Sequence, residues 1–303
     1  MVATPTVSTV SPTRVIRRDV PLRGFTSFKV GGPADRFAAP RTPEELLAVL
    51  DWGYSRTLPL TILGAGSNLL IGDRGIRGLV ICLRHLRGAQ IDPQSGRVVA
   101  AAGEPVARLA WQAAATGLSG LEWAVGIPGT VGGLVAMNAG AQGGCAADCV
   151  LSVEAIAPNG LQRTLLAPAL EYRYRHSRLQ ESSDLVIRAT LQLQPGCDPA
   201  VVTERTAAYL QKRKSTQPYH LPSCGSVFRN PPQGYAGQLI EAMGLKGHTL
   251  GRAQVAELHA NFILNLGGAT AQDIRDLIRY VRDRVQDRTG LLLVPEVKML
   301  GDF

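Results

Sequence analysis

The spacing of apolar side chains predicts several helices along the chain. Residues 42–54 carry their leucines on one helical face, and Thr42 with Glu45 is the pattern of a capping box. Residues 270–290 show the same periodicity and end at Gly290, a common helix terminator. Further helices are expected over 105–117, 199–214 and 234–247.

Shorter apolar runs predict strands. Residues 150–166 contain two such runs joined at Asn159-Gly160, a dipeptide typical of hairpin turns. Residues 184–193 alternate, which places Leu185, Ile187, Ala189, Leu191 and Leu193 on one face. Single strands are expected over 58–63, 96–103, 261–266 and 291–300.

The composition changes about two thirds of the way along the chain, from strand- and glycine-rich to more helical. We therefore predict an α+β protein with a flexible tail over 1–19, a first domain over 20–198 and a second domain over 199–303. The strand–helix–strand unit within 261–300 predicts a parallel pair with a right-handed crossover. Its terminal strand, 291–300, can also return to the first domain.

Composition and charge are those of an ordinary globular protein. The 303 residues are 45% hydrophobic and 18% charged, with a net charge of +8 and a pI of about 9.5. The basic residues are scattered and are not interleaved with aromatics, so a nucleic-acid binder is not favoured. An anionic small substrate accounts for the excess charge as well as a solvated basic surface does.

The sequence shows no sign of export, membrane insertion or metal binding. The N-terminus lacks the basic, apolar and cleavage regions of a signal peptide. Residues 126–141 are apolar, but they are too few and too rich in glycine to span a bilayer. The five cysteines include no CxxC pair, which favours free thiols in a reducing compartment. We expect a cytoplasmic protein without a metal ion.

Two loops are rich in glycine and small residues, GAGSN at 64–68 and GIPGTVGG at 126–133. The first is not a dinucleotide fingerprint, because Leu69 stands where the third glycine belongs. The second is not a P-loop, because no Gly-Lys-Ser/Thr follows. Such loops are either tight turns packed on the core or backbone that approaches a phosphate closely. The presence of two such loops favours a diphosphate-bearing ligand.

Three local patterns hold polar side chains that could do chemistry: Arg175 in YRYRHS, Ser226 in GSVFRNP and Glu296 in VPEVK. Glu296 lies within an apolar run beside a proline, so its carboxylate is not simply solvated. Ordinary interpretations exist as well: a surface salt bridge for Arg175, a turn residue for Ser226, and a buried pair with an arginine for Glu296. Spacing alone does not unite the three.

Taken in order over residues 20–303, the motifs resemble the UDP-N-acetylenolpyruvoylglucosamine reductase family. The resemblance implies a two-lobed FAD-binding module of the vanillyl-alcohol oxidase (PCMH) type and a smaller α+β substrate-binding domain. The stretch from Arg175 to Ser226 is too short for the extra tyrosine-bearing loop of type I members, which indicates type II. The motifs are FTSFKVGGPA, GAGSNLLIGD, GIPGTVGGLVAMNAGA, YRYRHS, GSVFRNP, LHANFILN and LVPEVKMLG.

The resemblance also implies a reaction: the NADPH-dependent reduction of UDP-N-acetylglucosamine enolpyruvate to UDP-N-acetylmuramate, in peptidoglycan precursor synthesis. NADPH would reduce non-covalently bound FAD, and flavin N5 would pass the hydride to C3 of the enolpyruvyl ether. Arg175 and Glu296 would stabilise the enol form, because a fixed guanidinium binds carboxylates in a fork. Ser226 would protonate C2.

Binding residues follow from the same resemblance. Those implied for the substrate are Tyr174, Gln217, Arg229, Asn230 and His259. Those implied for FAD are Gly64, Ala65, Gly66, Ser67, Asn68, Leu69, Gly126, Ile127, Pro128, Gly129, Thr130, Gly132, Gly133, Asn138, Ile187 and Arg213. The small-molecule substrate is the only partner expected, with no nucleic acid and no membrane, and we expect a monomer.

Two other functions fit parts of the sequence. An FAD-dependent oxidase or dehydrogenase of a small alcohol would share the glycine loops without needing Arg175, Ser226 and Glu296. Such enzymes often anchor the flavin through a histidine, and neither loop contains one. A non-catalytic nucleotide-binding protein would be colourless, and its binding would fall steeply with salt.

Overall fold

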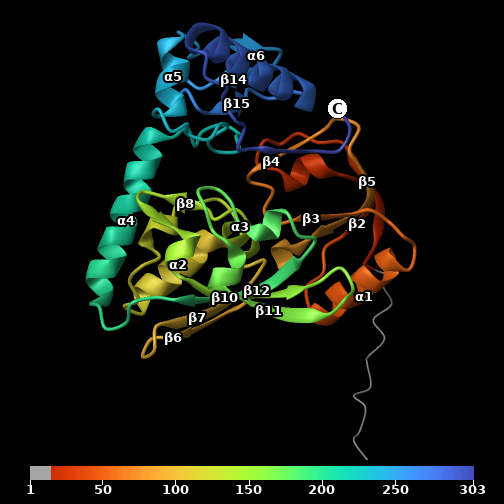
Figure 1. Cartoon of the computed structure of the whole chain (residues 1–303), viewed down its shortest axis with the longest axis vertical. Coiled ribbons are helices and arrows are strands. Elements are labelled where there is room, and N and C mark those ends of the chain that lie inside the picture. Colours follow the sequence, from red (N-terminus) through yellow and green to blue (C-terminus); the bar gives the residue numbers. More distant parts are fainter. Residues whose placement is uncertain (1–14) are drawn as a thin grey trace, which may run out of the picture.

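The computed structural model describes residues 15–303. These residues form three sheets of three or more strands, each with helices packed beside it, and two further strand pairs (Figure 1). The tail predicted over 1–19 falls mostly on residues 1–14, outside the described residues. Its last three residues, 17–19, belong instead to strand β1 (Arg17–Pro21).

The first sheet contains β1, β2 (Pro33–Ala38), β3 (Leu60–Leu63) and β5 (Ile76–Cys82), and α1 (Pro43–Tyr54) packs against it. Its order is β1-β2-β5-β3, with β1 antiparallel to β2 and the other neighbours parallel. Only half of the predicted capping box forms. Thr42 Oγ1 accepts from the Glu45 N–H at 3.3 Å, but the Glu45 carboxylate accepts from the Arg41 N–H at 2.7 Å.

The second sheet contains β6 (Ala89–Asp92), β7 (Arg97–Ala101), β10 (Val150–Ile156), β11 (Gln162–Leu166) and β12 (Leu185–Gln192). It is antiparallel throughout, in the order β11-β10-β12-β7-β6, and the hairpin predicted at Asn159-Gly160 is confirmed. The predicted alternation along β12 is only partly right. Val186 and Thr190 are buried together with Ala189 and Leu191, because this central strand buries both of its faces.

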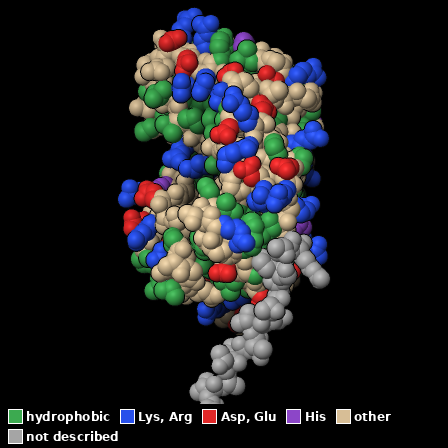
Figure 2. Space-filling model, turned by 90° about the vertical axis from the view of Figure 1, so that its right-hand side faces the viewer, with side chains coloured by type: hydrophobic (Ala, Val, Ile, Leu, Met, Phe, Trp, Pro, Cys, Tyr) green, Lys and Arg blue, Asp and Glu red, His purple; other side chains and the backbone are tan. Residues whose placement is uncertain are grey.

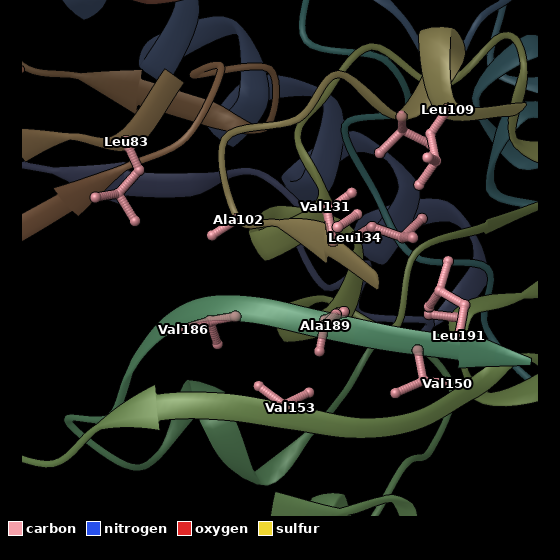
Figure 3. Close-up of a cluster of buried hydrophobic side chains, with 14 of the residues drawn as sticks. Leu83, Ala102, Leu109, Val131, Leu134, Val150, Val153, Val186, Ala189 and Leu191 are labelled. Atoms are coloured by element: carbon pink, nitrogen blue, oxygen red, sulfur yellow. The ribbon is translucent and has the colours of Figure 1, made fainter. Parts of the chain in front are cut away.

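Three helices belong with this sheet: α2 (Val106–Ala115), α3 (Val131–Ala136) and α4 (Pro199–Thr216). α3 contributes the buried side chains of Val131 and Leu134 to the core that also contains Ala189 and Leu191 of β12 (Figure 3). α4 contacts α2 and the 3₁₀ turn Glu122–Ala124, although it follows the predicted domain boundary. From there it runs toward the third sheet (Figure 1).

The third sheet contains β13 (Thr249–Leu250), β14 (Ala253–Val255) and β15 (Ile263–Asn265), with α5 (Ala236–Ala242) and α6 (Ala271–Thr289) beside it. A reciprocal capping box opens α6: Thr270 Oγ1 accepts from the Asp273 N–H, and the Asp273 carboxylate accepts from the Thr270 N–H, both at 3.0 Å. Gly290 ends it in the left-handed conformation, at φ +71°. Both predicted ends of this helix are confirmed.

The last strand does not form the predicted crossover pair. β16 (Lys298–Leu300) pairs in parallel with β4 (Leu69–Ile71), whereas β15 pairs antiparallel with β14. The predicted parallel pair is therefore wrong, and only 298–300 of the predicted strand 291–300 are in a strand. The segment before β16 passes along Val227, whose carbonyl accepts from the Glu296 N–H at 2.7 Å. This path brings Glu296 close to residues 64–69.

Surface charge, cysteine bonding and possible membrane or metal-binding features each bear on a sequence-based expectation. On the face drawn in Figure 2, Lys and Arg side chains are interspersed with Asp and Glu. All five cysteines are unbonded thiols. Across residues 15–303, no helix is at once long and apolar enough for a bilayer, and no three His, Cys, Asp or Glu side chains are grouped to hold a metal ion.

Candidate active site

A cavity of about 470 Å³ lies where the two glycine loops, the end of α4 and the segment before β16 meet. Most of the predicted site residues line it. From the predicted set they are Gly64, Ala65, Gly66, Ser67, Asn68, Leu69, Ile127, Pro128, Gly129, Thr130, Gly133, Arg175, Arg213, Gln217, Ser226 and Glu296. The sequence therefore predicted the walls of one cavity from segments spread over most of the chain.

The 64–68 loop needs its glycines for close approach. A Cβ on Gly64 would lie 2.6 Å from Thr130 Oγ1, so the two glycine loops touch at this point. Gly66 has φ +67°, and a Cβ there would lie 1.9 Å from the Phe25 carbonyl oxygen. A side chain at Gly64 would push the two loops apart, and one at Gly66 would push its loop away from Phe25.

Four residues predicted to bind the cofactor do not line the cavity: Gly126, Gly132, Asn138 and Ile187. Gly126 lies against Arg213, and the N–H of Gly132 donates to the Ala102 carbonyl at 2.8 Å. Ile187 packs at the edge of the main core, and its carbonyl accepts from the Ala102 N–H at 2.9 Å. These contacts lie within the protein and outside the cavity lining.

Asn138 supports the segment that carries Arg175. Its Nδ2 donates to the Arg173 carbonyl at 2.8 Å, and its Oδ1 accepts from the Ala147 N–H at 3.0 Å. Asn138 is buried and has φ +42°, an uncommon conformation outside glycine. Both ends of its amide thus make a hydrogen bond within the protein, and one of these bonds holds the segment that carries Arg175.

Arg175 and Glu296 meet in the cavity, with 2.9 Å between Nε and Oε1. The contact brings a guanidinium against a carboxylate, which makes it an ion pair. Arg175 itself has φ +54°, and its Nη2 donates to the carbonyl of Gly140, in β8 (Gly140–Ala141), at 2.9 Å. Ser177 and Gln180 add hydrogen bonds to the same segment, at 2.6 and 3.1 Å. The guanidinium and the backbone of its segment are thus both held in place.

The carboxyl group of Glu296 is largely buried. Burial raises its pKa above the ordinary value, and the positive charges of Arg175 and then Arg229 oppose that rise. The backbone on either side is fixed as well, since Asn68 Nδ2 donates to the Glu296 carbonyl at 3.1 Å. A glutamate so placed can hold a proton more readily than one in water.

Ser226 lines the same cavity as Arg175 and Glu296. Its hydroxyl has no hydrogen-bond partner among residues 15–303. The strand-like segment after it is locked by Asn261, whose amide accepts from the Phe228 N–H at 2.9 Å and donates to the Phe228 carbonyl at 2.8 Å. Cys224 is buried beside it, and burial raises the pKa of its thiol, so the thiolate is disfavoured.

The remaining predicted substrate residues lie outside the cavity lining. Tyr174 is 55% exposed, and its Oη accepts from the Asn230 N–H at 3.4 Å. Asn230 also accepts from the N–H of Ala236, at the start of α5, at 3.1 Å. His259 Nδ1 accepts from the Asn261 N–H at 3.2 Å, and its ring centroid lies 4.8 Å from that of Phe262. His259 therefore has a structural explanation.

The cavity includes residues that the sequence reasoning missed. Lys298 lies two residues after Glu296, and the alternation of an extended chain was a signal that both face the cavity. Lys212 precedes Arg213 on α4, and this pair of basic residues was a signal that Lys212 also lines the cavity. Gln142 gave no signal: its Nε2 donates to the Tyr209 carbonyl at 3.0 Å, while its buried Oε1 has no partner among the described residues.

Comparisons with known proteins show which family the chain resembles. A family model described as the C-terminal domain of UDP-N-acetylenolpyruvoylglucosamine reductase matches residues 217–300, and one described as an FAD binding domain matches 34–165. The UDP-N-acetylenolpyruvoylglucosamine reductase of Synechococcus elongatus is 56% identical over 294 residues, which are 97% of each chain. That of Nostoc sp. is 55% identical over 288 residues, 95% of this chain and 87% of its own.

A solved structure gives the same result for the fold. The crystal structure of the UDP-N-acetylenolpyruvylglucosamine reductase of Thermus caldophilus superposes with a TM-score of 0.79 at 36% identity, covering 94% of this chain and 100% of its own. The α+β fold, an FAD-binding domain followed by a smaller C-terminal domain, is therefore shared along nearly the whole chain. From this similarity and the sequence identities above, the chain belongs to the UDP-N-acetylenolpyruvoylglucosamine reductase family.

Proposed function

We propose that this protein reduces UDP-N-acetylglucosamine enolpyruvate to UDP-N-acetylmuramate in the cytoplasm, as a step of peptidoglycan precursor synthesis, with FAD as its cofactor and NADPH as the reductant. One observation carries the proposal: Arg175, Ser226 and Glu296 line the same cavity as both glycine loops. A small-alcohol oxidase would have no use for that set. The family membership supports the same reaction.

The residues present fit FAD. The two loops that line the cavity approach each other at Gly64 and Thr130, and their glycines let a diphosphate come close to the backbone. Two buried polar atoms at the cavity, Arg213 Nε and Gln142 Oε1, lack partners among residues 15–303 and could bond to a ligand. When bound, FAD supplies a two-electron carrier between NADPH and C3 of the enolpyruvyl group.

Arg175 would bind the substrate carboxylate. Its Nη2 is committed to Gly140 and its Nε lies against Glu296, but Nη1 has no acceptor among the described residues. A guanidinium stays protonated throughout the reaction, so it can stabilise the negative charge that builds on the carboxylate when C3 gains a hydride. Glu296, with its raised pKa, would share a proton with the enol form.

Ser226 would donate the proton to C2. Its hydroxyl is not engaged by any acceptor among the described residues, and it lines the cavity with the two charged groups. A serine is a weak acid in water, but a positioned hydroxyl can protonate a strongly basic carbanion. The lysine and arginine side chains of residues 212, 213 and 298 give the cavity the positive charge that a nucleotide diphosphate needs.

Anaerobic spectroscopy of the purified protein tests the proposal. A yellow protein that NADPH bleaches, and that UDP-N-acetylglucosamine enolpyruvate restores to the oxidised spectrum, is the expected result. Bleaching by a small alcohol would support the oxidase instead. A colourless protein that cannot be loaded with FAD would support the non-catalytic nucleotide binder and would end the proposal.

A further inference from the structure

Arg84 contacts the loop at 64–68 without lining the cavity. Its Nη2 donates to the Ala65 carbonyl at 3.3 Å and to the Phe25 carbonyl at 3.4 Å. Its guanidinium carbon also lies 5.0 Å from the centre of the Phe25 ring, within cation–π range. Arg84 therefore joins the glycine loop to the segment that precedes β2.

Arg84 is one of three donors that hold successive carbonyls of this loop. The Gly64 carbonyl accepts from Cys82 Sγ at 3.7 Å, the Ala65 carbonyl accepts from Arg84, and the Gly66 carbonyl accepts from the Ser27 N–H at 3.0 Å. In a trans peptide, the carbonyl and the following N–H point in opposite directions. The N–H groups of Ala65, Gly66 and Ser67 therefore point away from these donors.

Those three N–H groups have no acceptor among residues 15–303, and the three residues line the cavity. Successive free N–H groups of this kind form a concavity that binds anions. By binding the carbonyls, the three donors therefore set the direction in which the anion-binding N–H groups point.

The charge of Arg84 is not neutralised nearby. Within residues 15–303 no carboxylate lies within 4.0 Å of its guanidinium, although the chain has twelve ion pairs within that limit in the described part. Its side chain is partly buried, so its field is less screened than that of an exposed arginine. The field of this positive charge therefore extends to the loop that bears the free N–H groups.

We propose that Arg84 is a positioning residue for the diphosphate of the cofactor: it orients the Ala65–Gly66 peptide and adds an unpaired positive charge behind it. This inference rests on the proposed function, because the anion is taken to be the FAD diphosphate. Arg84 would not touch FAD. It would act through the loop that does, so its loss weakens the diphosphate part of binding and leaves the isoalloxazine part intact.

The test uses apoprotein prepared by removing the flavin, and measures the dissociation constants of FAD and of riboflavin by flavin fluorescence. Riboflavin carries the ring system without the diphosphate. For Arg84→Gln we expect the Kd of FAD to rise about tenfold, since a charge-assisted interaction is lost, and the Kd of riboflavin to stay within about twofold. Arg84→Lys, which keeps the charge, should raise the Kd of FAD less than Arg84→Gln does.

Arg97→Gln is the matched control, because Arg97 is exposed on β7 and its removal changes net charge equally. Its FAD affinity should equal that of the wild type. An unchanged Kd of FAD in Arg84→Gln would overturn the inference, and so would an equal weakening of FAD and riboflavin, which would indicate general disruption. If Arg84→Gln does not fold, the Kd values of FAD and riboflavin are compared in Arg84→Lys instead. A rise in the Kd of FAD alone would support the inference. A Kd of FAD that does not rise relative to that of riboflavin would overturn it. Wild-type protein that binds no FAD would instead contradict the proposed function.

Discussion

The Nε atom of Arg175 lies 2.9 Å from Oε1 of Glu296, inside a cavity that both glycine loops line. Arg175 belongs to the segment that Asn138 and Ser177 hold, and Glu296 belongs to the segment that leads into β16. The pair therefore joins two segments far apart in the chain, and the second of them leads into the strand that pairs with β4.

Ser226→Ala separates the two half-reactions. We expect NADPH to reduce the flavin at the wild-type rate, while reoxidation by the enolpyruvyl substrate slows by about 10²–10³-fold, because one positioned group of the second half-reaction is gone. Stopped-flow absorbance under anaerobic conditions measures both steps. Ser55→Ala, at the exposed residue that follows α1, should leave both rates unchanged. Normal reoxidation in Ser226→Ala would remove Ser226 from the mechanism.

Glu296→Gln tests the raised pKa of Glu296. Between the ordinary value of 4.5 and the raised value, the folded protein holds a proton that the unfolded chain releases, so the wild type loses stability as pH rises through this window. The variant lacks this loss. Relative to the wild type, the unfolding free energy of the variant should therefore increase as pH rises. Urea denaturation of both proteins at several pH values across the window measures this difference. A difference that is constant with pH, or that moves the other way, would mean that the pKa is not raised.

Asn138→Ala distinguishes positioning from cofactor binding. The sequence predicted that Asn138 binds FAD, whereas its amide donates to the Arg173 carbonyl and accepts from the Ala147 N–H. We expect kcat to fall about tenfold, because the guanidinium is less well held, while the Kd of FAD stays within about threefold. Ser177→Ala, which frees the same segment, should have a similar effect. A large loss of FAD affinity with unchanged kcat would restore the original assignment.

Gly66→Ala probes the close approach of the first loop. A Cβ at this position would lie 1.9 Å from the Phe25 carbonyl oxygen, on a backbone at φ +67°, so the loop must move. We expect a loss of about 2 kcal/mol or more in stability and a sharp loss of FAD binding. Gly129→Ala is the control for stability, because its Cβ would meet nothing closer than Ser67 Oγ at 3.5 Å. Thermal unfolding without FAD measures the stability of the two variants, and the shift on adding FAD reports its binding. Equal melting temperatures for Gly66→Ala and Gly129→Ala would contradict the expectation.

Local signals in the sequence predicted local structure well. The Thr270–Asp273 capping box and the Asn159-Gly160 hairpin formed as expected, because their hydrogen bonds join residues a few positions apart. The same logic was only half right at Thr42 and Glu45: Thr42 Oγ1 accepts from the Glu45 N–H, but the Glu45 carboxylate accepts from the Arg41 N–H. A capping box is only one of several bonds that an exposed glutamate can make.

The sequence by itself determined which residue types the chain offers for chemistry: two glycine loops, an arginine, a serine and a glutamate, in an order that identified the family. Only the tertiary structure decided that β16 pairs with β4 and not with β15, and hence that Glu296 meets Arg175. It also decided that Asn138 holds a loop and that Arg84 lies behind another. The physical reason is that strand partners and the orientation of buried polar groups depend on contacts between residues far apart in the chain, which periodicity and turn chemistry do not encode.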